Sequence, residues 1–426
     1  MKILLSAYSC VPGKGSEPGV GWNAVQQAAR FHNVWVLTHG EGRQEIKAAL
    51  AREPLRNVHF VYLDLPRWAF FWKKDRRGQR VHYYFWQVAA YFVGRRLHRK
   101  VGFDLIHHVT FVQYATPSFL VLLPVPFIWG PVGGGESAPR SFWWSYSLRG
   151  KVFELARVAA RKLCEYDPFV RLTARKASLG LATTEETARQ MRTVGCKRVS
   201  VLSAVSLSQE EIQHLSLTPA RHSGPFRLLS VGRLAHWKGC HLSLRAFAEF
   251  HRRFPDSEYW LVGDGPESKR LRELAQRLGV GQSVTFWGNV PRSEVLNKVG
   301  NCDILLHPCL HDSGGWASLE AMAAGRPVVC LNLGGLALQI TEQTGIKVTA
   351  NASKEAVNGL AAALLKLAGD PGLRLRMGKA SRQRVEEHFA CVRKGDFMKT
   401  IYENTLLRSA IEVTAAPYAT QPGIES

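Results

Sequence analysis

The sequence predicts an α/β protein with two doubly wound parallel sheets. Three observations support this fold class. Short apolar runs alternate with longer helix-forming stretches, glycine-rich turns follow several of the runs, and 426 residues are enough for two domains. The polar segment 206–224, which contains Pro219 and Gly224, is predicted to be a linker. We therefore expect a first domain over 1–205, a second over 225–393, a terminal helix over 394–410 and a disordered tail over 411–426.

The predicted strands are short and apolar, as in sheets that helices cover on both faces. In the first half they span residues 2–8, 34–38, 58–63, 104–108, 126–132, 179–183 and 199–201. In the second half they span residues 226–231, 259–262, 284–290, 303–308, 328–330, 331–335 and 346–348. Helices are predicted over 23–31, 240–254, 317–324, 356–367, 373–388 and 394–408.

Composition limits the class of protein. No uncharged apolar run is long enough for a transmembrane helix, and the apolar run at residues 1–5 is too short for a signal peptide. The eight cysteines show no C-x-x-C pairing, which is typical of reduced thiols in a cytoplasmic protein. The net charge is +22, and residues 1–205 carry 30 of the 56 Lys and Arg but 13 of the 34 Asp and Glu. This basic first half predicts an anionic partner.

Two segments of the first half combine aromatic and basic residues. Segment 66–100 contains Trp68, Trp72 and Trp86 beside a run of lysines and arginines, and segment 140–176 places Trp143 and Trp144 before a basic helix. Aromatic anchors beside cations favour an anionic membrane surface or a lipid diphosphate. The alternative is that the aromatics are core residues and the cations a solvated face. A nucleic-acid partner is not expected, because no recognisable binding module is present.

The stretch 303–330 reads as strand, glycine turn, helix and strand, with Asp312 in the turn and Glu320 inside the helix. Backbone N–H groups at a helix start suit an anionic ligand. A carboxylate inside the helix suits hydroxyl groups instead. Together they indicate a ligand with both phosphates and hydroxyls, such as a nucleotide sugar, although an ordinary turn with a solvated Glu320 is also possible.

A second turn, 232–239, follows the first strand of the second half. Arg233 and Lys238 lie at either side of this strand-to-helix turn. Two cations next to a helix start would form a diphosphate site. A surface pair of basic residues is the alternative.

The spacing Asp312-x7-Glu320, followed by Ala-Met-Ala-Ala-Gly-Arg-Pro-Val-Val, resembles the signature of retaining GT-B glycosyltransferases of family 4, the glycosyl transferases group 1. The Gly-Arg-Leu…Lys-Gly turn at 232–239 resembles a second motif of the same family. The resemblance implies two Rossmann-like domains facing across a cleft, with the terminal helix returning to the first. The sequence departs from the family pattern at Asp312, where the family has Glu, and at Gly314-Gly315, where it has Phe-Gly.

The resemblance also implies roles for residues of the second half. Glu320 would hold the nucleotide ribose, while Arg233 and Lys238 would hold the donor diphosphate and stabilise the leaving group. The donor sugar would face the Asp312 side chain and the N–H groups of Gly314, Gly315 and Trp316. Further donor contacts are expected at Gly263, Gly265, Gly288 and Val290, and in the glycine-rich loop 10–22 at Gly19 and Gly21.

The first half offers candidate acceptor and catalytic residues. Two histidines, His107 and His108, end a predicted strand, and the family often places a histidine there, near the reacting sugar. His108 is favoured because it lies nearer the carboxyl end of the strand, where open α/β sheets bind ligands. Gly134 and Glu136 follow the next strand, and Glu136 could contact an acceptor hydroxyl or act as a base. Core histidines and a plain turn are the alternatives.

The expected activity is transfer of a hexose from a UDP- or GDP-sugar to a glycan or lipid-linked acceptor at the cytoplasmic face of the membrane. Anomeric configuration would be retained, and no metal is expected, because no metal-ligand cluster or Asp-x-Asp element is present. A nucleotide-sugar epimerase, with Asp312, Glu136 and Glu17 as carboxylates near the sugar, is a second possibility. A non-catalytic, membrane-associated partner subunit is a third.

Overall fold

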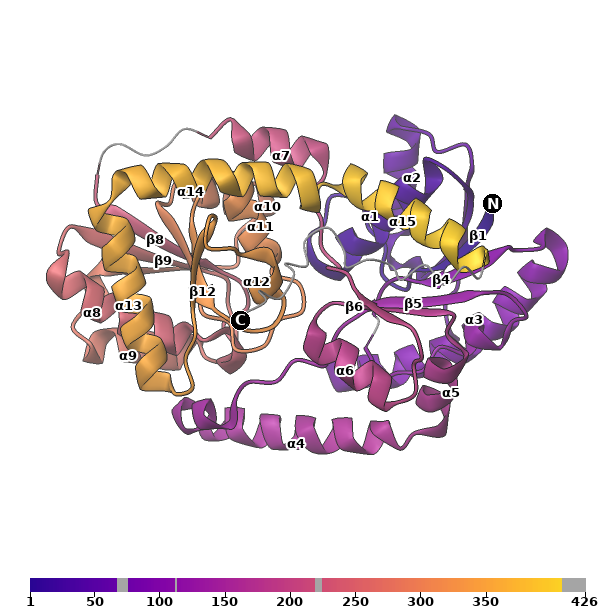
Figure 1. Cartoon of the computed structure of the whole chain (residues 1–426), viewed down its shortest axis with the longest axis horizontal. Coiled ribbons are helices and arrows are strands. Elements are labelled where there is room, and N and C mark those ends of the chain that lie inside the picture. Colours follow the sequence, from indigo (N-terminus) through magenta and orange to yellow (C-terminus); the bar gives the residue numbers. More distant parts are fainter. Residues whose placement is uncertain (67–75, 112, 219–223, 408–426) are drawn as a thin grey trace, which may run out of the picture. The chain divides into compact units, whose positions relative to one another are not determined.

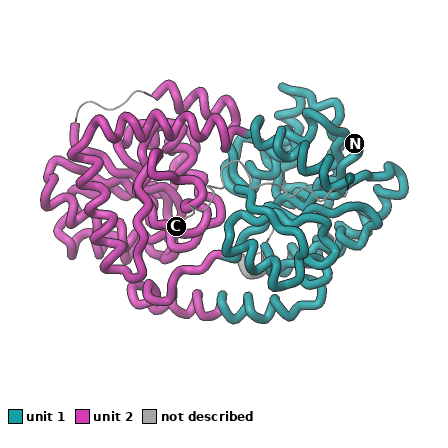
Figure 2. Tube along the Cα trace, viewed as in Figure 1, with its two compact units in different colours: residues 1–135, 157–206, 391–426 teal, residues 136–156, 207–390 magenta. Residues whose placement is uncertain are grey.

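The computed structural model describes residues 1–66, 76–111, 113–218 and 224–407, without the side chains of 76–80. The chain divides into two compact units (Figure 2). Unit 1 comprises residues 1–135, 157–206 and 391–426, and unit 2 comprises residues 136–156 and 207–390. Each unit contains one parallel sheet with helices packed against it (Figure 1), so the predicted α/β fold class is confirmed.

The sheet of unit 1 has the strand order β3-β2-β1-β4-β5-β6-β7, and all neighbouring strands are parallel. The order reverses between β1 and β4, which makes the carboxyl ends of these two strands the switch point where open sheets bind ligands. The strands are β1 (Lys2–Ser6), β2 (Asn33–Thr38), β3 (Val58–Tyr62), β4 (Leu105–His108), β5 (Phe127–Val132), β6 (Leu179–Ala182) and β7 (Val199–Val201).

The sheet of unit 2 repeats this arrangement with the order β10-β9-β8-β11-β12-β13, again all parallel. Its switch point therefore lies between β8 and β11. The strands are β8 (Phe226–Val231), β9 (Ser257–Val262), β10 (Val284–Gly288), β11 (Ile304–His307), β12 (Val328–Leu331) and β13 (Gly345–Val348). The central strands β11 and β12 are buried at every position, which explains why they read as continuous apolar runs.

Helices connect the strands and cover the sheets. Unit 1 contains α1 (Ser16–Ala29), α2 (Arg43–Arg52), α3 (Arg76–Val101), α5 (Pro168–Lys176), α6 (Glu185–Thr193) and α15 (Cys391–Leu406), and α4 (Leu148–Glu165) is divided between the units. Unit 2 contains α7 (Gln209–Ser216), α8 (Cys240–Arg253), α9 (Ser268–Arg277), α10 (Arg292–Gly300), α11 (Trp316–Ala323), α12 (Gly334–Gln339), α13 (Ser353–Gly369) and α14 (Pro371–Arg384).

The unit boundaries differ from the predicted ones in two places. Residues 136–156 group with unit 2, and the first part of the predicted linker is helix α7. A reciprocal capping box explains that helix, since Ser208 accepts from the Glu211 N–H while the Glu211 carboxylate accepts from the Ser208 N–H. The strand predicted over 331–335 is also wrong, because β12 ends at Leu331 and α12 begins at Gly334.

Helix α1 corrects the prediction of a glycine-rich loop over 10–22. It begins at Ser16, so Gly19 and Gly21 lie inside a helix and both are buried. Glycine has low helix propensity, but at position 21 close packing requires it. A Cβ on Gly21 would lie 2.2 Å from the Ser9 carbonyl oxygen. Gly21 therefore allows α1 to approach the backbone that follows β1.

Helix α15 packs against α1 within unit 1. The Arg30 guanidinium pairs with the Asp396 carboxylate at 3.0 Å and donates to the Val392 carbonyl at 3.0 Å. These contacts keep the terminal helix with the first sheet. The predicted disordered tail beyond residue 410 lies outside the described residues.

The aromatic residues of the two basic segments separate into core and surface. Tyr83 and Trp86 of α3 are buried, so they are core residues and not surface anchors, whereas Phe92 is exposed. Phe142 is buried and Trp144 is 84% exposed. Positions 67–75, which include the predicted anchors Trp68 and Trp72, lie outside the described residues.

The composition predicts reduced cysteines and no transmembrane helix. None of the eight cysteines, all of which belong to the described part of the chain, forms a disulfide. Among the described residues, no helix combines the length and apolarity that crossing a bilayer requires.

Candidate functional site

The candidate site lies at the switch point of the unit 2 sheet. A small cavity of about 10 Å³, enough for roughly one water molecule, opens where β8 and β11 end. Its walls come from β8 and the following turn, from the start of α8 and from the end of β11: Ser230, Val231, Gly232, Leu234, Lys238, Cys240, His307 and Pro308. The site thus lies where the topology of a doubly wound sheet favours ligand binding.

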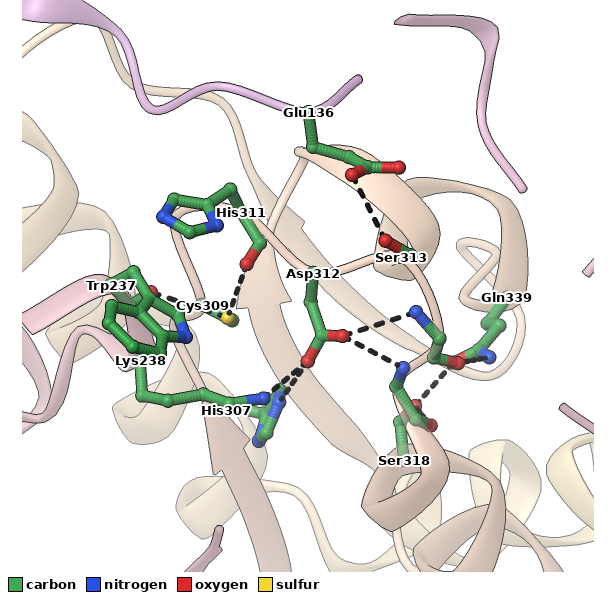
Figure 3. A network of polar contacts seen from close by, with 12 residues as sticks. Glu136, Trp237, Lys238, His307, Cys309, His311, Asp312, Ser313, Ser318 and Gln339 are labelled. Carbon is green, nitrogen blue, oxygen red and sulfur yellow. Dashed lines mark hydrogen bonds and ion pairs between the residues drawn. The ribbon is translucent and has the colours of Figure 1, made fainter. Parts of the chain in front are cut away.

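Lys238 and Asp312 form the charged centre of this site (Figure 3). The Lys238 ammonium donates to the Asp312 Oδ2 at 2.5 Å, and both side chains are about one-fifth exposed. Burial opposes both charged forms, but their mutual attraction prevails. It lowers the pKa of Asp312 well below its usual range and raises the pKa of Lys238. Both groups are therefore ionised over the physiological pH range.

His307 completes the centre and was not singled out by the sequence. Its Nε2 lies 3.7 Å from the Asp312 Oδ2, too far for a hydrogen bond, and this buried nitrogen has no hydrogen-bond partner. Burial lowers the pKa of His307, so the ring is neutral at pH 7. The apolar strand pattern could place His307 at the end of β11, but not its direction toward Asp312.

The Asp312 side chain is turned onto its own loop. Its Oδ1 accepts from the N–H groups of Gly314 at 3.1 Å and Gly315 at 3.4 Å. The resemblance implies that these N–H groups face the donor sugar, and in the structure they are bonded to Asp312 instead. Ligand access to the Gly314 and Gly315 N–H groups therefore requires Asp312 to move or to share them. The Trp316 indole N–H is buried without a hydrogen-bond partner.

Residues of α12 hold the Asp312 loop in place, and the sequence did not point to them. The Gly335 N–H donates to the Asp312 carbonyl at 2.8 Å. Gln339, whose side chain lies beside the loop in Figure 3, donates through Nε2 to the Gly314 carbonyl. The Ser318 hydroxyl donates to the Gln339 Oε1 at 2.5 Å. The loop is therefore supported from the helix that follows the next strand.

Glu320 of α11 is almost completely buried, at 2% exposure. Burial raises the pKa of Glu320 to about 7, although the adjacent Arg292 guanidinium opposes the shift. Arg292 Nη1 donates to Glu320 Oε1 at 2.5 Å, and Arg292 Nη2 donates to Glu211 Oε1 at 2.7 Å. The predicted ribose carboxylate thus has a cationic partner from α10 that the sequence did not suggest.

The other predicted donor contacts occupy turns of unit 2. Arg233 is exposed in the turn after β8, and Val290 is partly exposed after β10. Packing explains the two glycines after β9. A Cβ on Gly263 would lie 2.2 Å from the Gly232 carbonyl oxygen, and a Cβ on Gly265 would lie 2.4 Å from the Leu234 carbonyl oxygen. Gly288 has φ +67°, which favours glycine, and space around its missing Cβ.

Glu136 is a predicted acceptor residue that follows β5, and its acceptor role stays a prediction. It belongs to unit 2, and its Oε2 accepts from the Ser313 hydroxyl at 3.0 Å (Figure 3). Glu136 therefore contacts the loop that carries Asp312. Gly134, the neighbouring candidate, stays in unit 1 and has φ +92°.

Glu154 links a second pair of histidines to this loop and was also missed. Its buried Oε1 lies 3.0 Å from the His236 Nε2 and 3.1 Å from the His311 Nε2. His311 directly precedes Asp312, and its ring stacks on Trp237. The inner face of α4 thereby fixes both turns that border the site.

The adjacent histidines of unit 1 are both buried. The His108 Nε2 lies 2.8 Å from the Tyr83 hydroxyl, and burial lowers the pKa of His108 to about 3. The His107 Nδ1 lies 2.8 Å from the Tyr402 hydroxyl, and burial lowers the pKa of His107 to about 4. Both rings are neutral at pH 7. The catalytic role of His108 and the acceptor role of His107 stay predictions.

The second half of the chain is similar in sequence to known proteins. Residues 218–384 match the family described as "Glycosyl transferases group 1". The chain is 33% identical to a glycogen synthase of Mycobacterium tuberculosis over 168 residues, which are 39% of this chain and 40% of that protein. It is 34% identical to a D-inositol 3-phosphate glycosyltransferase of Corynebacterium jeikeium over 157 residues, which are 35% of this chain and 36% of that protein. These matches therefore span less than half of each relative.

Solved structures extend the similarity to nearly the whole chain. Sucrose-phosphate synthase from Thermosynechococcus elongatus superposes with a TM-score of 0.63 and 18% identity, covering 96% of this chain and 100% of that one. HepE from Anabaena, solved with UDP and glucose, superposes with a TM-score of 0.59 and 18% identity, covering 95% and 99%. At such identities the likeness concerns the fold. The chain thus has the GT-B fold, and residues 218–384, within unit 2, are similar to the glycosyl transferases group 1 domain.

Proposed function

We propose that this protein transfers a sugar from a nucleotide diphosphate sugar to a glycan or lipid-linked acceptor. The observation that carries the proposal is the Lys238–Asp312–His307 group at the switch point of the family domain. A donor diphosphate would replace Asp312 as the partner of the Lys238 ammonium. The anion would then gain a charge-assisted hydrogen bond as the leaving-group charge develops. HepE, which shares the fold, binds UDP-glucose, and a UDP- or GDP-hexose is the proposed donor.

The proposed reaction retains the anomeric configuration and uses no metal. Lys238 and Arg233 would bind the diphosphate, and Glu320 would accept hydrogen bonds from ribose hydroxyls. The acceptor would attack on the face from which the diphosphate departs, and its proton would pass to the departing oxygen. Glu136, bonded to Ser313 beside the donor loop, is the side chain proposed to contact the acceptor.

A thermal-shift screen against UDP- and GDP-sugars tests donor binding, because a specific ligand raises the unfolding midpoint by mass action. We expect one donor to raise the midpoint and the same donor to be consumed when an acceptor is added. Inversion at the anomeric carbon, measured by NMR of the product, would reject retention. Epimerisation of the donor without acceptor would favour an epimerase, and tight binding without turnover would favour a partner subunit.

We also propose that unit 1 binds the cytoplasmic face of an anionic membrane. Along α3, the exposed apolar residues Val81, Phe85, Val88 and Phe92 recur at helical spacing, and the exposed Arg95, Arg96 and Arg99 continue the same face. Apolar groups beside cations suit an anionic lipid surface.

Cosedimentation with vesicles checks the membrane proposal. Binding to vesicles that contain phosphatidylglycerol should exceed binding to neutral vesicles and decrease as salt rises. We expect Phe85→Ser combined with Phe92→Ser to weaken it, whereas Leu375→Ser, an exposed leucine of unit 2, should not. If the Phe85→Ser, Phe92→Ser protein bound these vesicles as well as Leu375→Ser does, this role for α3 would be contradicted.

A further inference from the structure

Three side chains at the end of β11 converge as metal ligands do. The ligand atoms of His307, Cys309 and Asp312 all lie within 4.8 Å of one another. They belong to one short stretch of unit 2, and Figure 3 shows them facing the same space beside Lys238. The site therefore offers one imidazole nitrogen, one thiol sulfur and one carboxylate oxygen.

Two further observations make this a site for a ligand. The His307 Nε2 is buried and has no hydrogen-bond partner, so its lone pair is available once the tautomer places the proton on Nδ1. His307 also lines the cavity that has room for roughly one water molecule. Access is provided by Asp312, whose side chain is 19% exposed, whereas His307 and Cys309 are buried behind it.

We propose that Zn²⁺, or another soft divalent ion, binds His307, Cys309 and Asp312 and blocks the donor-diphosphate site. A thiolate, an imidazole and a carboxylate suit Zn²⁺, whereas Mg²⁺ prefers oxygen ligands alone. Tetrahedral Zn²⁺, with bonds of about 2.0 to 2.3 Å, separates its ligand atoms by roughly 3.5 Å, so the group would contract by about 1 Å. The fourth position would hold water.

Zn²⁺ binding requires local changes at Cys309 and at Asp312. The Cys309 thiol gives up its hydrogen bonds to the Trp237 and His311 carbonyls and releases its proton to solvent as the sulfur–zinc bond forms. Asp312 exchanges the Lys238 ammonium for the metal. The displaced ammonium is repelled by the divalent ion and leaves the position where it would meet a diphosphate. This inhibitory consequence rests on the proposed function, while metal binding does not.

Co²⁺ is the direct probe of the site, because it replaces Zn²⁺ and is coloured. Titration of the wild-type protein should give tetrahedral d–d bands and a thiolate-to-cobalt charge-transfer band at one equivalent. We expect Cys309→Ser to abolish the charge-transfer band and to weaken Co²⁺ binding at least about tenfold, since loss of even an outer-shell partner of a metal ligand has an effect of this size. Cys302→Ser removes another buried thiol of unit 2, outside the cluster, and should bind Co²⁺ as the wild type does.

Circular dichroism shows whether each variant is folded, and Asp312→Asn provides a second test that leaves the thiol in place. A charge-transfer band that persists in Cys309→Ser, or Co²⁺ affinity unchanged in both ligand variants, would overturn the metal site. In the transferase assay, Zn²⁺ should raise the donor KM of the wild type at least tenfold more than that of Cys309→Ser, and a chelator should reverse the effect. Co²⁺ binding without this inhibition would reject the blocking role alone.

Discussion

Replacing Lys238 with methionine should lower kcat/KM for the donor by about 10²- to 10³-fold, the usual effect of losing one preorganised group that stabilises developing negative charge. Methionine keeps most of the side-chain volume and removes the ammonium. If Lys238 stabilises the leaving group, kcat should decrease more than KM increases, because the interaction strengthens as the diphosphate departs. Steady-state kinetics with varied donor would separate the two constants.

The same change leaves Asp312 without its partner, so a control must separate lost catalysis from a displaced loop. The variant Lys238→Met with Asp312→Asn removes both charges and keeps the side-chain sizes. If the unpaired carboxylate caused the loss, this double variant would be as active as Asp312→Asn alone, and we expect it to be less active. Lys379→Met removes an exposed lysine of α14 in the same unit and should be near wild type. A loss below about tenfold in Lys238→Met would contradict the leaving-group role.

The sequence was sufficient for the elements that depend on local patterns. The strand ending at His307, the glycine turn and helix α11 follow one another as apolar run, glycines and helix formers, and each signal is contained in a few residues. Arg233 and Lys238 could be assigned to one turn for the same reason. The second sheet was therefore predictable from its sequence apart from the false strand at 331–335.

The geometry of the site could not be predicted, because it depends on contacts between distant residues. Lys238 and Asp312 are 74 positions apart, and only the folded sheet brings β8 and β11 together. Their pairing, and the bonds from Asp312 to the Gly314 and Gly315 N–H groups, follow from that adjacency. Similarly, Gly21 reads as a loop residue by propensity, whereas in α1 a glycine is needed because a Cβ would meet the distant Ser9 carbonyl oxygen.

Replacing Arg292 with methionine should lower the free energy of unfolding by about 3 kcal/mol at pH 8, as expected when one partner of a largely buried ion pair is removed. Arg292 bridges Glu320, whose side chain is 3% exposed, and Glu211, whose side chain is 25% exposed. Without the guanidinium, the buried Glu320 carboxylate has lost its charge partner. Urea unfolding followed by circular dichroism would measure the change.

The loss should depend on pH, because Glu320 can escape the penalty by taking up a proton. The pKa of Glu320 is raised from 4.5 to about 7 in the folded protein. Between these values the unfolded chain binds fewer protons than the folded one, so rising pH lowers stability until Glu320 ionises near pH 7. Removing Arg292 raises that folded pKa further, and the variant continues to lose stability above pH 7. The difference from wild type should therefore be larger at pH 8 than at pH 5.

A double-mutant cycle assigns this effect to the pair. Glu320→Gln removes the ionisable group, so it should flatten the pH dependence of stability between about pH 4.5 and 7. Adding Glu320→Gln to Arg292→Met should recover part of the stability lost at pH 8, since no charge then remains buried without a partner. If the double variant were no more stable than Arg292→Met, the arginine would act through Glu211 or through packing of α10. In that case Glu320 would not be the group that requires Arg292.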